Sequence, residues 1–129
     1  MKIAIVERNS DMLDIYRELF LDLPVRTDSF QVLDPSKIVG GAYDLLVSHL
    51  GLPYKSNLDR IQRIRHAAPH LPIVMISGCI EYSVDEMMKR GVSRVFYKPK
   101  DLLDAMAWIH QMVMRDQVVN HPTMVATSF

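Results

Sequence analysis

The chain of 129 residues carries 15 basic and 15 acidic residues, and 49% of its residues are hydrophobic. These values fit one globular domain with a substantial core, and they give no overall attraction to nucleic acid or to an anionic membrane. The single cysteine, Cys79, excludes an intrachain disulfide and a cysteine-cluster metal site. Because the apolar run at residues 3–6 is too short for a signal peptide or a membrane span, we expect a cytoplasmic protein.

Five short apolar runs predict β-strands, at residues 3–6, 25–29, 44–48, 73–76 and 94–97. The first, third and fourth runs are nearly continuous, as in parallel strands that helices cover on both faces. Helical periodicity extends from Met12 to Leu23, after the capping candidates Asn9 and Ser10. Further helices are predicted around residues 58–68, 84–88 and 102–113 and, as a weaker candidate, 33–40.

The alternation of strands and helices predicts an α/β fold with a doubly wound parallel sheet and right-handed crossovers. We expect residues 1–116 to form this domain and residues 117–129 to form a C-terminal tail. Doubly wound sheets bind ligands at the carboxyl ends of their strands, so the segments that follow the strands are the candidate site. They read ERNS at 7–10, SHLGLP at 48–53, SG at 77–78 and KP at 98–99.

In order and spacing, these segments resemble the receiver domains of bacterial response regulators, over roughly residues 1–116. The resemblance implies a five-stranded, flavodoxin-like sheet with strand order 2-1-3-4-5. In the family an acidic pair stands where this chain has Glu7 and Arg8, and the phosphoryl-accepting aspartate stands at the position of His49. Ser77 and Lys98 match the hydroxyl residue and the lysine of the family pattern. The chain therefore resembles a degenerate receiver, or pseudo-receiver.

These substitutions change the chemistry that the resemblance implies. Mg²⁺ prefers carboxylate oxygens and water, whereas a pocket of Glu7, Arg8 and Lys98 is formally positive when His49 is neutral. A neutral imidazole also cannot form the acyl phosphate that an aspartate forms. We expect a degenerate phosphoacceptor pocket of Glu7, Arg8, His49, Ser77 and Lys98, with no bound Mg²⁺ or other cofactor, no metal site, no catalytic residue and no enzyme activity.

Several interpretations of the pocket stay open. His49 is interpreted as a polar residue satisfied by Glu7 or a loop backbone, and the alternatives are a metal ligand, a pH sensor or a phosphorelay acceptor that forms phosphohistidine. A Glu7–Lys98 ion pair is expected in place of the Mg²⁺ bridge. Ser77, Arg8 and Lys98 form a hypothetical pocket for phosphate or sulfate, unless Arg8 extends into solvent.

The last predicted helix indicates a partner surface. Ala105, Trp108 and Met112 recur at helical spacing beside the expected core positions, although a helix packed only on its own sheet has a polar outer face. The alternative is that tail residues fold back over this stripe. In receivers the fourth helix, fifth strand and fifth helix form the usual partner surface, and an aromatic or histidine switch residue stands at the position of Val95.

We therefore expect a stand-alone signalling module of the two-component or phosphorelay type. It would act by binding a signalling protein or a second copy of itself through that surface, with no nucleic-acid or membrane partner. A receiver that is still phosphorylated, at His49 or another residue, is the alternative.

Overall fold

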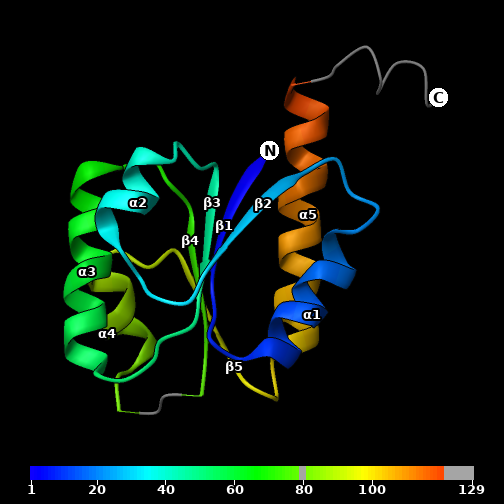
Figure 1. Cartoon of the computed structure of the whole chain (residues 1–129). Coiled ribbons are helices and arrows are strands. Elements are labelled where there is room, and N and C mark those ends of the chain that lie inside the picture. The colour runs from blue at the N-terminus through cyan, green and yellow to red at the C-terminus, as the bar shows by residue number, and fades with distance from the viewer. Residues whose placement is uncertain (79–80, 121–129) are drawn as a thin grey trace.

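A computed structural model describes residues 1–78 and 81–120, with side chains described as far as residue 116; Cys79 lies outside these residues. Strands and helices alternate along the described chain (Figure 1). The elements are β1 (Lys2–Val6), α1 (Ser10–Phe20), β2 (Arg26–Phe30), α2 (Pro35–Gly40), β3 (Leu45–Ser48), α3 (Tyr54–Ala67), β4 (Ile73–Ser77), α4 (Val84–Lys89), β5 (Arg94–Tyr97) and α5 (Leu102–Asn120). Every predicted strand is confirmed with bounds that differ by no more than one residue.

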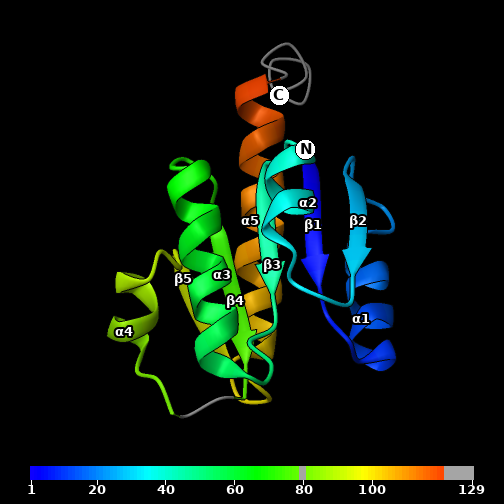
Figure 2. The same cartoon turned by 60° about the vertical axis from the view of Figure 1, so that its left-hand side comes forward.

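The strands form one parallel sheet in the order β2-β1-β3-β4-β5. The helices α2, α3 and α4 cover one face of this sheet, and α1 and α5 cover the other face (Figures 1 and 2). This arrangement confirms the predicted doubly wound, flavodoxin-like fold. The carboxyl ends of the strands consequently meet at one edge of the sheet, which is the lower edge in Figure 1.

Burial on both faces explains why the central strands are continuous apolar runs. Alternate residues of β1, such as Ala4 and Val6, pack into the cluster under α2, α3 and α4, whereas Ile3 and Ile5 pack into the cluster under α1 and α5. All residues of β3 and β4 are buried. The edge strand β2 contains three exposed residues, which accounts for its more polar sequence.

Local side-chain hydrogen bonds explain where several helices begin. The Asn9 side chain accepts the backbone N–H of Met12 at 3.0 Å and caps α1, and Asp34 caps α2 ahead of Pro35. The periodic pattern placed the end of α1 too late, because the chain turns after Phe20 and the Leu23 N–H donates to the Phe20 carbonyl. It also missed the polar first turn of α3, which starts at Tyr54.

The last helix extends farther than the expected domain boundary. It continues to Asn120, four residues past the boundary expected at 116, and residues 121–129 of the predicted tail lie outside the described residues. Over the part of the chain that is described, no helix combines the length and the apolar character needed to cross a membrane.

Arg65 connects the end of α3 to the segment between α4 and β5. Its Nε–H donates to the Gly91 carbonyl at 2.9 Å, and its Nη1 donates to the carbonyls of Ala68 and Pro69. Gly91 has a positive φ of 112°, and a Cβ atom built on it would lie 2.7 Å from Cβ and Cγ of Arg65. Both the backbone conformation and the close approach of Arg65 therefore require glycine at this position.

Replacing Gly91 with alanine tests this requirement. We expect Gly91→Ala to lower the free energy of unfolding by about 1–3 kcal/mol, because alanine is strained at this φ and meets Arg65. Urea titration followed by circular dichroism measures the change. Gly40→Ala is the matched control, since nothing lies within 4 Å of the added Cβ and no positive φ is involved; equal losses in the two variants would contradict the assignment.

Candidate functional site

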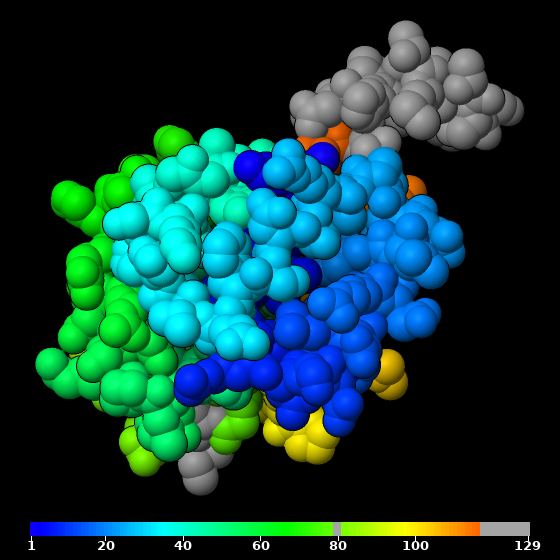
Figure 3. Space-filling model, viewed as in Figure 1, coloured from blue at the N-terminus to red at the C-terminus, as the bar shows by residue number. Residues whose placement is uncertain are grey.

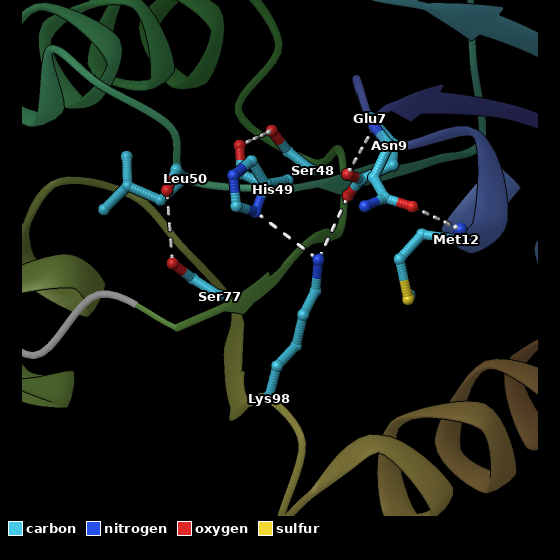
Figure 4. A network of polar contacts seen from close by, with 8 residues as sticks. All are labelled: Glu7, Asn9, Met12, Ser48, His49, Leu50, Ser77 and Lys98. Atoms are coloured by element: carbon cyan, nitrogen blue, oxygen red, sulfur yellow. Dashed lines mark hydrogen bonds and ion pairs between the residues drawn. The ribbon is translucent and has the colours of Figure 1, made fainter.

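The candidate site lies at the carboxyl edge of the sheet. Glu7 follows β1, His49 follows β3, Ser77 ends β4 and Lys98 follows β5. In Figure 4 the Lys98 side chain extends between the side chains of Glu7 and His49. The parallel sheet thus brings together residues that lie up to 91 positions apart in the sequence.

Glu7 is a buried carboxylate whose two oxygens are both engaged. Its side chain is 2% exposed, and Oε2 lies 3.2 Å from Nζ of Lys98, which is itself 20% exposed. Oε1 accepts the backbone N–H of Asn9 at 3.0 Å. The expected Glu7–Lys98 ion pair is therefore present. A carboxylate buried to this extent must be paired, because an isolated charge in this position carries a large desolvation cost.

His49 lies on the other side of Lys98. Its backbone N–H donates to the Val6 carbonyl at 3.0 Å, and its Nδ1 lies 3.5 Å from Lys98 Nζ. Because an ammonium group only donates, Nδ1 is the acceptor in this long contact, and the proton of the neutral ring belongs on Nε2. Burial and the nearby Lys98 charge lower the pKa of His49 below 6.5, against smaller raising effects of Glu7 and of a hydrogen bond with the Ile76 backbone. The ring is therefore neutral at pH 7.

Ser77 and Arg8 differ in burial and in the surroundings of their side chains. Ser77 is fully buried, and its hydroxyl donates to the Leu50 carbonyl at 3.2 Å. Arg8 is exposed and lines a separate cavity, to which neither Ser77 nor Lys98 contributes. The cavity that Arg8 lines is also lined by Glu7 and His49, the two side chains that contact Lys98, so the convergence of Arg8, Ser77 and Lys98 on phosphate or sulfate stays a prediction.

The cavity beside Arg8 has a volume of about 200 Å³. It lies between the segment after β1, the connection from β2 to α2, the connection from β3 to α3, and the first turns of α3. Its lining residues are Val6, Glu7, Arg8, Gln31, Val32, Leu33, His49, Gly51, Leu52, Asn57 and Arg60. Sequence reasoning missed Gln31, Asn57 and Arg60. Their positions, directly after β2 and in the first turns of α3, were the available signal, since both segments start at the carboxyl edge.

The side chains at this edge do not fit Mg²⁺. The ion prefers several carboxylate and water oxygens, whereas Glu7 is the only carboxylate among the described residues that line the cavity. Both oxygens of Glu7 are already engaged by Lys98 and Asn9. In addition, no group of three or more potential ligands from His, Cys, Asp and Glu is found among residues 1–78 and 81–116.

The second candidate surface lies on β5 and α5. Ala105 is fully buried, together with Ile109 and Val113, so the expectation that Ala105 faces a partner is wrong; the small residue lies against the sheet. Trp108 and Met112 are partly exposed. Trp108 packs against Phe96 with ring centroids 6.3 Å apart. A further cavity of about 400 Å³ is lined by Arg94, Val95, Phe96, Asp101, Asp104, Ala107, Trp108 and Gln111.

The residues before Lys98 alternate between the two faces of the sheet. Phe96 packs into the cluster under α1 and α5, whereas Val95 and Tyr97 pack against the cluster under α2, α3 and α4. The position at which the resemblance implies a switch aromatic is thus a partly buried valine. Tyr97 shares its face of the sheet, two residues farther along the strand.

Comparison with known proteins identifies the fold. Searches by sequence find no matching protein family and no matching curated protein. A response regulator receiver domain protein from Clostridium thermocellum has a TM-score of 0.71 at 18% identity, covering 92% of this chain and 98% of that chain. An orphan response regulator of H. pylori has a TM-score of 0.71 at 15% identity, covering 88% of this chain and 96% of that chain. The BeF3-activated receiver domain of DrrB has a TM-score of 0.67 at 19% identity, covering 85% of this chain and 94% of that chain. The chain therefore has the fold of response-regulator receiver domains.

The environment of His49 predicts a pH dependence of stability. Its pKa is lowered in the folded protein, so the unfolded chain binds more protons as the pH falls through 6.5. We expect the free energy of unfolding of the wild type to decrease below pH 6.5 relative to that of His49→Asn, with a difference in slope below about 1.4 kcal/mol per pH unit. Urea titrations of both proteins over a pH series measure the free energy of unfolding. Parallel dependences of this free energy on pH in the two proteins would contradict the prediction.

Proposed function

We propose that the chain is a receiver-like signalling module of the bacterial two-component type, acting in the cytoplasm, which is not phosphorylated at the usual position and signals by binding another protein or a second copy of itself. The fold supports the receiver part of this proposal. The observation that carries the rest is the Glu7–Lys98–His49 arrangement: the acceptor position is a neutral imidazole, and the buried carboxylate is neutralised by a lysine rather than left for a metal ion.

The charges of the site argue against aspartyl-phosphate chemistry. Transfer of a phosphoryl group needs compensation of the charge on its oxygens, which is normally supplied by metal ions and positioned cations. Lys98 is paired with Glu7, and the side chains at this edge do not fit Mg²⁺. On this proposal the site lacks the groups that would make it reactive toward a phosphoryl donor.

The β5–α5 surface supports the binding part of the proposal. Trp108 is only partly buried and borders a cavity with Arg94, Asp104 and Gln111 at its margin. Tryptophan is enriched at the centres of protein interfaces, and polar and charged residues are typical of their rims. Since Ala105 is buried, the surface proposed for a partner consists of Trp108, Met112 and the residues that line this cavity.

Phosphorylation is tested by incubating the protein with acetyl phosphate and Mg²⁺ and measuring the intact mass. We expect no phosphoryl adduct on the wild type. A double variant, Arg8→Asp with His49→Asp, restores carboxylates at both family positions and is expected to gain a Mg²⁺-dependent adduct. A stoichiometric adduct on the wild type that disappears in His49→Ala would refute the proposal in favour of a phosphohistidine relay.

The binding surface is tested with substitutions at its rim and centre. We expect Trp108→Ala and Gln111→Arg each to weaken self-association or partner capture at least tenfold, as expected for the loss of a buried aromatic contact or the insertion of an unpaired charge. Light scattering measures self-association, and pull-down with the immobilised chain measures capture.

Two controls separate binding from folding in this experiment. Val39→Ala removes exposed apolar surface from α2, on the opposite face of the sheet, and should change neither measurement. Gln111 is exposed, so Gln111→Arg should retain the wild-type unfolding midpoint even if Trp108→Ala is destabilised by the loss of its contact with Phe96. Unchanged mass and capture in both surface variants would show that the interface lies elsewhere.

A further inference from the structure

The cavity beside Arg8 combines cationic and apolar walls. Arg8 and Arg60 line it, and neither has a carboxylate within ion-pair distance among the residues whose side chains are described. The one carboxylate in the lining, Glu7, is neutralised by Lys98 at 3.2 Å. Two guanidinium groups thus remain uncompensated at the cavity, and they are the side chains best suited to bind planar or tetrahedral anions.

Arg60 is held in place before any ligand arrives. Its Nη1 donates to Oδ1 of Asn57 at 2.8 Å, and Nδ2 of Asn57 donates to the Gly51 carbonyl at 2.8 Å. The guanidinium is therefore tied through Asn57 to the connection between β3 and α3, and it retains other N–H groups for a ligand. A side chain ordered in this way loses less conformational entropy when it binds an anion.

The same cavity has an apolar side that an inorganic ion would not use. Val32 and Leu52 are 59% and 71% exposed, and both line it, so they offer apolar surface to a ligand. Val6 and Leu33 form the buried wall. In Figure 3 the blue segment after β1 passes below the cyan connection between β2 and α2 and reaches the green region of α3, so these cavity-forming segments meet on the visible surface.

We propose that this cavity binds a small organic anion, with a phosphate or carboxylate head on Arg8 and Arg60 and an apolar body against Val32 and Leu52. Its volume of about 200 Å³ exceeds the roughly 150 Å³ of a cavity that accepts benzene. It is smaller than the 300 Å³ at which pockets for drug-sized ligands begin. The fitting ligand is therefore about the size of a substituted single ring. This site goes beyond the proposed signalling function, and neither phosphorylation nor docking at Trp108 is needed for it.

Titration of the ¹⁵N-labelled full chain with phenyl phosphate, benzoate, inorganic phosphate and benzyl alcohol tests the site by NMR. We expect saturable shifts of the Val32, Gly51 and Leu52 amides with phenyl phosphate or benzoate. The better of the two should bind at least tenfold more tightly than inorganic phosphate or benzyl alcohol. The organic anions contact both the arginines and the apolar wall, whereas inorganic phosphate lacks the ring and the alcohol lacks the charge. Comparison of phenyl phosphate with benzoate shows which head group the site prefers.

Variants locate the binding at the two arginines. Arg60→Gln and Arg8→Gln should each weaken binding about tenfold or more, as expected for the loss of a charge-assisted hydrogen bond. Arg63→Gln is the matched control, because Arg63 is an exposed arginine of α3 that does not line the cavity, and it should bind as the wild type does. The unfolding midpoint of each variant, measured by urea titration, confirms that it is folded.

Three results would overturn the proposal. One is the absence of saturable shifts with both organic anions up to about 10 mM, well above the range expected for ligands of this size. Another is equal affinity for inorganic phosphate and the organic anions, and the third is unchanged affinity in Arg60→Gln. Each is independent of the acetyl phosphate experiment and of the Trp108 variants, so this site and the signalling proposal can fail separately.

Discussion

The buried carboxylate of Glu7 is the constraint on which the arrangement of the site depends. A side chain that is 2% exposed at the end of β1 cannot remain ionised without a partner, and the partner that the fold supplies is Lys98 after β5. The lysine in turn lies 3.5 Å from Nδ1 of His49 and disfavours a charge on its ring. One desolvated group therefore holds Lys98 next to His49, where the burial of the imidazole and the lysine charge together lower the pKa of His49.

Much of the fold could be predicted from local patterns in the sequence. The continuous apolar runs of β1, β3 and β4 reflect burial on both faces, and the alternation with helices then leaves few possible topologies. The ion pair was predictable because Glu7 and Lys98 directly follow strands that run to the same edge. The end of α1 and the start of α3 could not be predicted in the same way. A turn after Phe20 ends α1, and the first turn of α3, from Tyr54, is polar.

The features that sequence reasoning placed wrongly depend on geometry between elements. Ala105 has the spacing of a second apolar stripe, yet α5 is rotated so that this small residue lies against the sheet and Trp108 lies at its margin. Arg8 lines one cavity with Glu7 and His49, as its sequence position suggests, but also with Arg60, which sequence reasoning did not foresee. Helical spacing and strand order do not specify the rotation of a helix or the side of a loop on which a long side chain lies.

The Glu7–Lys98 pair has a consequence for how the site is occupied. A metal ion fills its site by mass action, so its occupancy and the stability it adds depend on the free ion concentration. The ammonium group of Lys98 is covalently attached to the chain and is present at a fixed effective concentration. The charge of the buried carboxylate is thus balanced in every folded molecule, whatever the ionic composition of the solution. A metal site can be empty at low ion concentration, whereas Lys98 always stands beside Glu7.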